Sequence, residues 1–459
     1  MNNNSTNVNN LVVGLDIGTT KIATVVGYRN ENGQIEVIGH GLGDSTGVEF
    51  GEIKNLNHTV EGILHSKDIA SQRTNFEIEE AYVGIAGHHI KTSKYNRYIH
   101  RDGNRNPISQ EEIDNAKKDV FEVEVAPGEK IIDVIPQRYI IDDERETPEP
   151  VGELGNKIIA TYQLITGKDK EIQKIFDCCH NANLEINDVI LEPIASGLAC
   201  LSEEEKKQGC VLVDIGGGTT DMIIYIDGSP VYTKVISLGG NIITKDIAQV
   251  CKISEDVAEQ LKIKHGTCIV DKSNANNFIT ISSRYGQEPI QISENYLAQI
   301  INCRVQEEIL NSIKKEIENS GYKDRLYAGL ILTGGGANLR HIKELCQYTL
   351  QLNTRIGVPD NGFSRTLSSD LKQPMFSTAL GLLKYGIEAE EYNMSRPLDE
   401  EESEGNGMLG GIFGGKKENK KTEKKPENQH RVPDGGGREK WGFFSKVYDW
   451  LKTSLEKFS

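Results

Sequence analysis

Residues Val211–Asp221 read VLVDIGGGTTD: a short apolar run, an aspartate, three consecutive glycines, two threonines and a second acid. The length and β-branching of the run predict a buried strand. The glycines allow positive φ and let backbone N–H groups approach a ligand closely. A concave run of N–H groups suits phosphate oxygens, and Asp214 suits a Mg²⁺ ion held on the phosphates and contacted through water. The alternative is a glycine-rich hairpin whose acid is satisfied within the protein.

The same pattern occurs a second time, in Val12–Lys21, which reads VVGLDIGTTK. Alternating apolar residues resume after each copy, so each unit is predicted to be strand, phosphate turn, strand. Neither copy is a Walker loop, because no Gly-Lys-Ser/Thr follows and no helix opens there. A third glycine cluster, Leu332–Asn338, follows a predicted strand at 329–332 and opens a helix.

Three glycine turns in this order, two of them with an aspartate, resemble the actin, heat-shock-chaperone and sugar-kinase superfamily. In that superfamily two similar halves close on one nucleotide, with two phosphate loops and an adenosine loop. The resemblance implies an α/β, actin-like duplicated two-half fold that binds ATP and Mg²⁺. The candidate nucleotide-binding residues of the turns are Gly18, Thr19, Thr20, Lys21, Gly216, Gly217, Gly218, Thr219, Thr220, Gly334, Gly335 and Gly336. Asp16 and Asp214 are the candidate Mg²⁺ residues, acting through water.

Length and composition limit the class of protein. A chain of 459 residues predicts two or three domains, and 37% hydrophobic residues suits packed domains but not a membrane-spanning class. A net charge of −16 argues against nucleic-acid binding. The eight cysteines are scattered, which predicts reduced core residues of a cytosolic protein. The Asn-rich first ten residues lack the pattern of a signal peptide.

Residues 84–166 are predicted to form an inserted small subdomain, β-rich with one helix near Ser109–Phe121. Within it, Pro136-Gln137-x-Tyr139, Pro150-x-Gly152 and the exit Ile165-Thr166-Gly167 resemble the FtsA family of cell-division actin homologues. In that family the small subdomain is relocated relative to actin. We expect the insert to make protein contacts and to carry no chemistry.

The predicted organisation begins with a disordered N-terminus and alternates between the two halves. In chain order it comprises the N-terminus (1–10), the first half with phosphate turn 1 (11–83), the insert (84–166), the rest of the first half (167–208), the second half with phosphate turn 2 (209–239), its small subdomain (240–303), and the remainder of the second half with the adenosine loop, returning to the first half (304–387). A disordered linker (388–440) and an amphipathic membrane-targeting helix (441–459) follow.

Three further candidate residues depend on the resemblance. Glu192 precedes a proline at a predicted helix start. The matching acid of the superfamily sits near Mg²⁺ and the attacking water, so the resemblance makes Glu192 the candidate to orient that water, which is a catalytic role. The alternative is a helix-capping glutamate. Glu259 and Lys262 share a helix face, and matching residues in the family reach the ribose and adenine. The alternative for this pair is a solvated ion pair.

The last nineteen residues, WGFFSKVYDWLKTSLEKFS, are predicted to form a helix lying in the headgroup region of a membrane. Seven apolar side chains, Val447 among them but not Trp450, fall within an arc of roughly 120°, and the helix is too polar to span a bilayer. The candidate membrane residues are Trp441, Phe444, Tyr448, Trp450, Leu451, Leu455 and Phe458. The alternative is a helix that docks on the core or on a partner.

The resemblance therefore implies a cytoskeletal adaptor at the cytoplasmic face of the membrane, at the division septum. It would polymerise and anchor the ring of the tubulin homologue FtsZ, whose C-terminal peptide binds the 240–303 subdomain, and meet later division proteins. The alternatives are a pilus-assembly actin-like adaptor and a small-molecule kinase of the same superfamily. Binding of ATP needs only the turns, whereas turnover needs a positioned water and a closed cleft, so the sequence leaves the rate of any ATPase activity open.

Overall fold

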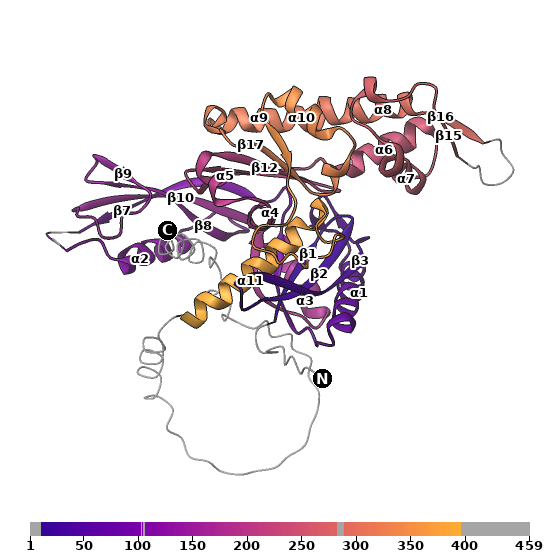
Figure 1. The fold of residues 1–459 in the computed structure, drawn as a ribbon. Helices are drawn as coiled ribbons and strands as arrows, with labels where there is room; N and C mark the ends of the chain where they lie inside the picture. Colours follow the sequence, from indigo (N-terminus) through magenta and orange to yellow (C-terminus); the bar gives the residue numbers. More distant parts are fainter. Residues whose placement is uncertain (1–10, 102, 104–105, 282–288, 396–459) are drawn as a thin grey trace, which may run out of the picture.

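The computed structural model describes residues 11–101, 103, 106–281 and 289–395 of the chain (Figure 1). The predicted disordered N-terminus (1–10), the linker from residue 396 onward and the predicted membrane helix (441–459) lie outside these residues. Among the described helices, none is long and apolar enough to cross a bilayer.

The first half is built on a five-stranded sheet of order β11-β6-β1-β2-β3. Glycines let helices pack directly on both faces of this sheet. Gly14 on β1 lies against the backbone of α11 (Ser377–Ser395), and Gly41 on β3 lies against the backbone of α1. The elements are β1 (Val12–Ile17), β2 (Lys21–Arg29), β3 (Ile35–Asp44), β4 (Val48–Glu49), β5 (Glu52–Ile53), α1 (Leu56–Thr74), β6 (Glu80–Ile85), α3 (Asp169–Asn181) and β11 (Glu185–Leu191).

The second half repeats this plan in a five-stranded sheet of order β14-β13-β12-β17-β18. In each half, a fully buried strand that ends near the key aspartate pairs antiparallel with the next strand and parallel with a later one. The expected duplicated actin-like fold is therefore confirmed. The elements are β12 (Cys210–Ile215), β13 (Thr220–Ile226), β14 (Ser229–Ile236), β17 (Gly329–Thr333), α10 (Ile342–Leu350) and β18 (Thr354–Ile356).

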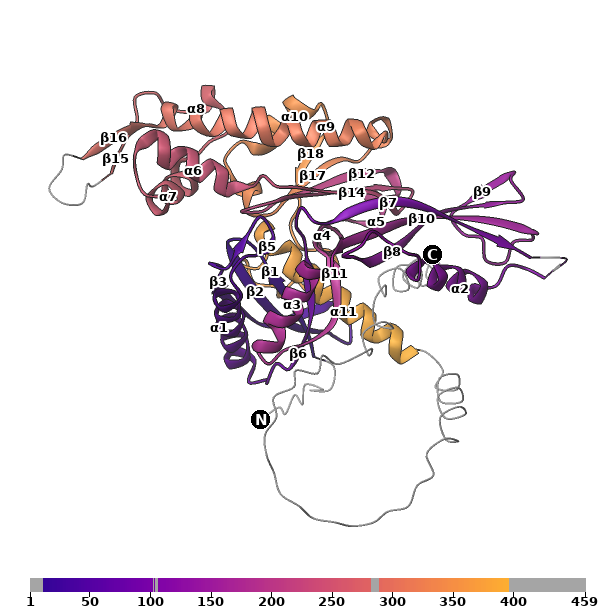
Figure 2. The same cartoon turned by 180° about the vertical axis from the view of Figure 1, so that it is seen from behind.

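The insert forms its own four-stranded sheet of order β7-β10-β8-β9, covered by one helix. The predicted helix near Ser109–Phe121 is present, and Ser109 caps it, because its side chain accepts from the Glu112 N–H in a capping box. Figure 2 shows the strands of the insert beside those of the second half. The elements are β7 (Lys91–His100), α2 (Gln110–Phe121), β8 (Glu129–Ile141), β9 (Arg145–Thr147) and β10 (Lys157–Lys168).

The small subdomain of the second half is mainly helical. A long helical run comprises α8 (Glu294–Arg304), a π-helical segment (Val305–Leu310) and α9 (Asn311–Ser320). Arg304, the last residue of α8, pairs with Asp246 at 2.6 Å. The remaining elements are α6 (Gly240–Cys251), α7 (Glu255–His265), β15 (Phe278–Ile281) and β16 (Ile290–Ser293).

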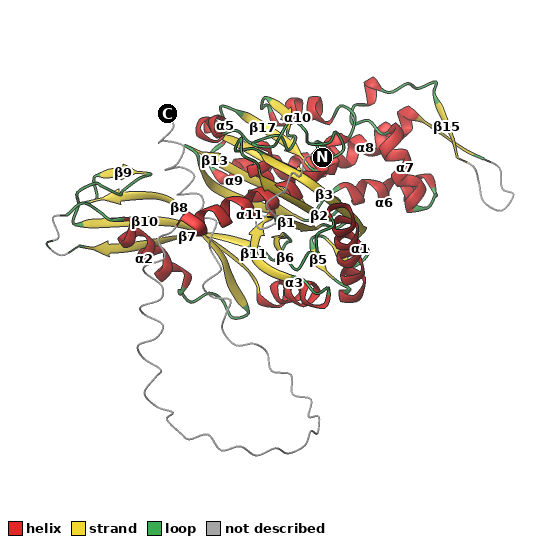
Figure 3. Cartoon of the chain, turned by 60° about the horizontal axis from the view of Figure 1, so that its bottom comes forward, coloured by secondary structure: helices red, strands yellow, loops and turns green. Residues whose placement is uncertain are grey.

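Two helices join the halves: α4 (Glu192–Cys200) with the short α5 (Glu203–Gln208) behind it, and α11 (Ser377–Ser395). Figure 3 shows α11 running along the first half. The predicted linker boundary at residue 388 is wrong, because α11 continues to Ser395 and both Glu388 and Ala389 are buried.

All eight cysteines are free thiols and six are buried as expected, but Cys303 is exposed and Cys251 is half-buried.

Candidate functional site

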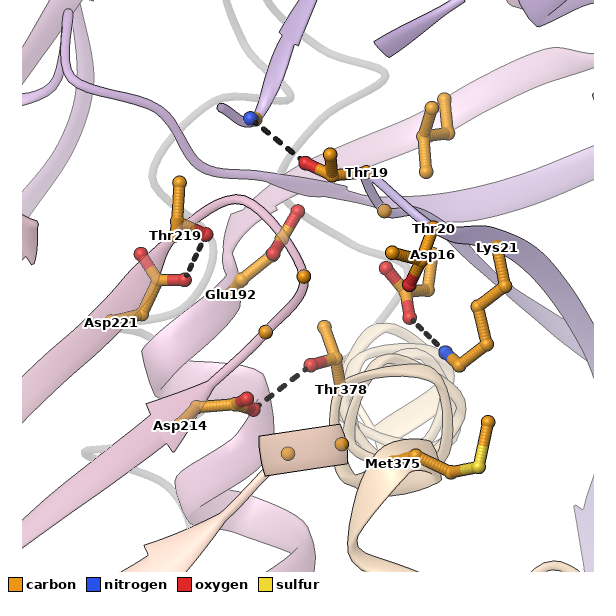
Figure 4. Close-up of a pocket in the computed structure, with 17 residues that line it drawn as sticks. Asp16, Thr19, Thr20, Lys21, Glu192, Asp214, Thr219, Asp221, Met375 and Thr378 are labelled. Carbon is orange, nitrogen blue, oxygen red and sulfur yellow. Dashed lines mark hydrogen bonds and ion pairs between the residues drawn. The ribbon is translucent and has the colours of Figure 1, made fainter. Parts of the chain in front are cut away.

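An open cleft lies between the two halves (Figure 4), with an empty volume of about 650 Å³ that includes space open to the solvent. Both aspartate-bearing turns contribute to it, together with the third glycine turn and the start of α4. The lining residues are Asp16, Ile17, Gly18, Thr19, Thr20, Lys21, Gly51, Glu192, Asp214, Gly216, Gly217, Thr219, Asp221, Gly334, Gly335, Met375 and Thr378. The cleft therefore brings most of the predicted turn residues together. Gly218, Thr220 and Gly336 are not among its lining residues.

The second turn is oriented by the N-terminus of α6. The Gly216 carbonyl accepts from the Gly240 N–H, and the Gly217 carbonyl accepts from the Asn241 N–H, both at 2.8 Å. Because a trans peptide points its C=O and the following N–H in opposite directions, the N–H groups of Gly217 and Gly218 point away from α6. Capping the helix therefore fixes the turn amides in the direction that a bound anion requires.

The glycines of the second turn are needed because the first turn lies very close to them, not because their backbone is left-handed. The expected positive φ is absent from Gly216, Gly217 and Gly218, and occurs in the third turn at Gly334, with φ of 82°. A Cβ on Gly217 would lie 2.2 Å from Thr20 Cγ2, and one on Gly218 would lie 2.6 Å from the Thr19 hydroxyl. The turns of the two halves thus touch, and side chains at these glycines would separate them.

The cleft concentrates acidic groups. Four of its lining residues are carboxylic acids and one, Lys21, is a cation, which pairs with Asp16 at 3.1 Å. Asp214 accepts hydrogen bonds from Ser196 at 2.8 Å and Thr378 at 3.4 Å. Burial raises the pKa of Asp214 to about 6. Where these acids are ionised, the cleft would repel a bare polyphosphate unless a cation lay beside it.

Asp221 completes the acidic cluster and lies opposite Asp214 in the β12–β13 register. Burial, with the neighbouring Asp214 carboxylate, raises the pKa of Asp221 to about 8. One carboxyl oxygen accepts from Thr219 at 3.0 Å, while the buried Oδ1 has no hydrogen-bond partner among the described residues. An orphaned buried acceptor facing the cleft fits a cation or its hydration water as the missing partner.

Glu192 is the first residue of α4, as predicted, and its side chain lines the cleft (Figure 4). Burial, followed by the charges of Asp16, Asp221 and Asp214, raises its pKa well above the ordinary glutamate value. No side-chain capping bond is present at this helix start. The position therefore favours a cleft role for Glu192 over helix capping.

Glu259 and Lys262 do not line the cleft. They form an ion pair of 2.7 Å on α7, in which the Lys262 side chain is 9% and the Glu259 side chain 38% exposed, so the pair is partly buried. The Lys262 ammonium also donates to the Gly240 carbonyl at 2.9 Å and to the Thr244 hydroxyl at 2.7 Å. The pair holds α7 against the start of α6, directly behind the second turn.

Several site residues carry no sequence signal that would single them out. The Ser45 hydroxyl donates to the Gly18 carbonyl at 2.6 Å, and the Gly51 N–H donates to the Thr19 hydroxyl at 3.1 Å. Met375 and Thr378 reach the cleft from the beginning of α11 and the turn before it. Asp221 is the second acid of its motif in the second half. The equivalent position of the first half is Ala23, so the repeat of the motif did not single out Asp221.

Comparison with known proteins gives a consistent family. The family model described as "Cell division protein FtsA" matches residues 211–381, and "SHS2 domain inserted in FTSA" matches residues 87–166. The FtsA protein of Pseudomonas aeruginosa is 33% identical over 386 residues, 84% of this chain and 91% of the relative. That of Neisseria meningitidis is 34% identical, over 86% of this chain and 95% of the relative. That of Escherichia coli K12 is 32% identical, over 83% of this chain and 91% of the relative.

Solved structures show the same fold at lower identity. The PilM-PilN type IV pilus biogenesis complex matches with a TM-score of 0.58 and 16% identity, over 82% of this chain and 98% of that one. MreB5 of Spiroplasma citri bound to ADP matches with a TM-score of 0.51 and 14% identity, over 85% and 100%. These two likenesses concern the actin-like fold alone, whereas the sequence relatives extend over most of the chain. The chain belongs to the FtsA family of cell-division proteins.

Proposed function

We propose that this protein binds Mg·ATP in the cleft, assembles into filaments, and anchors the division ring to the cytoplasmic face of the membrane at the septum. The observation that carries the nucleotide part is that two glycine–threonine turns, each preceded by an aspartate and one from each half, meet in one acidic cleft. The fold relative MreB5 was solved with ADP and with AMPPNP. That likeness supports the choice of an adenine nucleotide.

The donor set of the cleft fits Mg²⁺. Asp16 and Asp214, at the ends of equivalent strands, would hold its hydration water, and the orphaned oxygen of Asp221 offers a further acceptor. A bound Mg²⁺ would neutralise the phosphates and the acidic cluster together. Glu192 would orient a water near the terminal phosphate, and Lys21 would contact a phosphate oxygen. Slow hydrolysis is compatible with this arrangement.

The proposed partners follow from the family. The C-terminal peptide of FtsZ would bind the 240–303 subdomain, copies of the chain would join into filaments, and later division proteins would join the assembly. The helix at 441–459 would supply the membrane anchor. Membership of the FtsA family favours this function over the pilus-assembly and small-molecule-kinase alternatives.

Two binding measurements test the proposal. Calorimetry of the full chain with ATP, with and without Mg²⁺, is expected to show saturable binding that depends on Mg²⁺. Co-sedimentation with liposomes is expected to require residues 441–459. Absence of nucleotide binding would refute the first part, and sedimentation of a chain lacking 441–459 as complete as that of the full chain would refute the second.

Substitution of Asp214 separates its charge from its hydrogen bonds. Asp214→Asn keeps an acceptor for Ser196 and Thr378 but removes the charge, so it is expected to abolish the gain in affinity on adding Mg²⁺ without weakening Mg²⁺-free binding. Asp214→Ala is expected to weaken Mg·ATP binding as well and to cost about 1–3 kcal/mol in unfolding free energy, because buried hydroxyls lose their acceptor. Calorimetry with thermal unfolding measures both. Equal Mg²⁺ dependence in Asp214→Asn and the wild type would exclude the charge role.

The acidic cluster predicts a pH dependence. Burial raises the pKa values of Asp214 to about 6 and of Asp221 to about 8, so in Mg²⁺-free protein these carboxyls gain protons as the pH falls from 8 to 6. Mg²⁺ favours their charged forms and must displace those protons. Affinity for Mg·ATP is therefore expected to rise about tenfold from pH 6 to pH 8, with proton release on binding. Calorimetry in buffers of different ionisation enthalpy measures the release, and Asp221→Asn should flatten the profile. An affinity that falls over this range would contradict the linkage.

A further inference from the structure

The hairpin of β4 and β5 has an unusual turn. Its two central residues, Phe50 and Gly51, both have positive φ, 51° and 72°. A turn of this kind usually carries Asn-Gly, because bulky side chains resist positive φ. Backbone strain of this kind persists only where the surroundings hold it, and it concentrates at switch regions and ligand sites. The contacts of the hairpin show what holds it.

On the cleft side, the turn of the hairpin touches both phosphate turns. The Gly51 N–H donates to the Thr19 hydroxyl at 3.1 Å, and Gly51 lines the cleft. A Cβ on Gly218, which belongs to the other half, would lie 2.6 Å from the Thr19 hydroxyl oxygen and 2.9 Å from the Phe50 nitrogen. A ligand that engages Thr19 and draws the two turns together therefore also acts on the hairpin.

On its other side, the hairpin touches both connections of the insert to the first half. At the entrance to the insert, Gly87 has φ of 128°, and a Cβ there would lie 3.2 Å from the Gly51 carbonyl oxygen. At the exit, β10 runs directly into α3, and Lys174 of α3 donates to the Ile53 carbonyl at 3.0 Å. A shift of the hairpin is thus felt at both roots of the insert.

The insert also contacts the second half, to which it has no direct chain connection. Gln137 of β8 donates to the Pro230 carbonyl, and Gln163 of β10 donates to the Thr233 hydroxyl at 3.3 Å. Gln163 is buried, yet its Oε1 has no hydrogen-bond partner among the described residues. The Gln163 amide is therefore only partly satisfied at this interface with β14, and a shift of the insert there would not break a fully satisfied polar network.

We infer that the β4–β5 hairpin couples occupancy of the cleft to the orientation of the inserted subdomain. A ligand on Thr19 fixes the hairpin, the hairpin fixes the two roots of the insert, and the insert shifts against β14. The inference rests on the proposed nucleotide binding. It gives the insert, which carries no residue of the cleft, the role of presenting the nucleotide state to neighbouring molecules.

Hydrogen exchange of the full chain, followed by mass spectrometry with and without Mg·AMPPNP, tests the coupling. In the wild type, the ligand is expected to change exchange at the entrance of the insert and in β14. Gly87→Ala disturbs the contact with Gly51 but is not itself a lining residue, so it is expected still to saturate with Mg·AMPPNP, at somewhat lower affinity, and to lose these remote changes. Lys174→Gln, which breaks the exit contact, is expected to reduce them.

The matched control is Gly152→Ala. Gly152 also has positive φ, 85°, and lies in the insert, but a Cβ there meets no atom within 4 Å. The variant likewise places an alanine at positive φ but has no contact to the hairpin, and its exchange response should match that of the wild type. Remote changes that persist in Gly87→Ala, or that are lost equally in Gly152→Ala, would overturn the coupling. So would tight Mg·AMPPNP binding by a wild type that shows no remote change, and that result would leave the proposed function intact. Failure of the wild type to bind at all would refute the proposed function itself.

Discussion

Replacing Gly217 by valine is expected to abolish binding of Mg·ATP. A Cβ at this position would lie 2.2 Å from Thr20 Cγ2, across the contact between the two phosphate turns. To relieve that overlap, the turns must separate by about an ångström, which would take donors of the two turns out of hydrogen-bond reach of the same phosphates. The two γ-methyl groups of valine add a further obstruction. Calorimetry at pH 8 with Mg·ATP measures the loss, and thermal unfolding checks that the core remains folded.

A compensating pair makes this prediction specific. Gly217→Ala alone is expected to weaken binding less than valine does, because only the Cβ is added. Adding Thr20→Ser removes the methyl group that the new Cβ would strike and keeps the hydroxyl, so the double variant should recover most of the affinity. Thr20→Ser should not rescue Gly217→Val. Full affinity in Gly217→Val would show that the phosphates bind elsewhere.

The sequence predicted the cleft well because its chemistry is local. The two glycine–threonine turns, each preceded by an aspartate, follow apolar strands, and their duplication indicated two facing halves before any contact was known. The reason given for the glycines was partly wrong. Positive φ was expected, but Gly217 is required by its distance from Thr20. That distance joins residues of different halves, and no local pattern contains it.

Other errors share the same origin. The composition after Ile387 is rich in Glu, which predicts a linker, yet α11 continues to Ser395. Packing overrides composition here, because Tyr385 and Ala389 are buried and the Tyr385 hydroxyl donates to Asp188 at 2.8 Å. The Ser45–Gly18 bond was missed for a similar reason, since a lone serine after a strand carries no signal. Segments whose state depends on distant partners are those that a single sequence predicts least well.

The membrane anchor lies outside the described residues, and its prediction rests on the sequence of 441–459. Seven apolar side chains share one face of the predicted helix: Trp441, Phe444, Val447, Tyr448, Leu451, Leu455 and Phe458. Shallow insertion at roughly 1 kcal/mol for each side chain gives about 7 kcal/mol. This corresponds to a dissociation constant on the order of 10 µM, so a single chain would bind the membrane weakly and reversibly.

Leu451→Glu is therefore expected to release the protein from liposomes while the core still binds Mg·ATP, and Trp450→Glu is expected to act in the same way. Leu451 lies near the centre of the apolar arc, and a charge there opposes insertion. Thr453→Glu, on the face turned away from the arc, is the matched control and should sediment almost as the wild type does. Equal sedimentation of Leu451→Glu and Thr453→Glu would exclude a membrane-inserted apolar face.

Assembly should convert this weak anchor into a firm one. When two chains are joined, the second helix inserts from a high effective concentration, and avidity can exceed the single-chain affinity by about 10²-fold or more. A variant that no longer polymerises but retains residues 441–459 is therefore expected to bind liposomes at least several-fold more weakly than the wild type. Sedimentation over a range of protein concentrations measures this, because binding of the wild type should rise steeply where filaments form. If the polymer-deficient variant sediments as well as the wild type, anchoring is independent of assembly, and filament formation must serve the ring in another way.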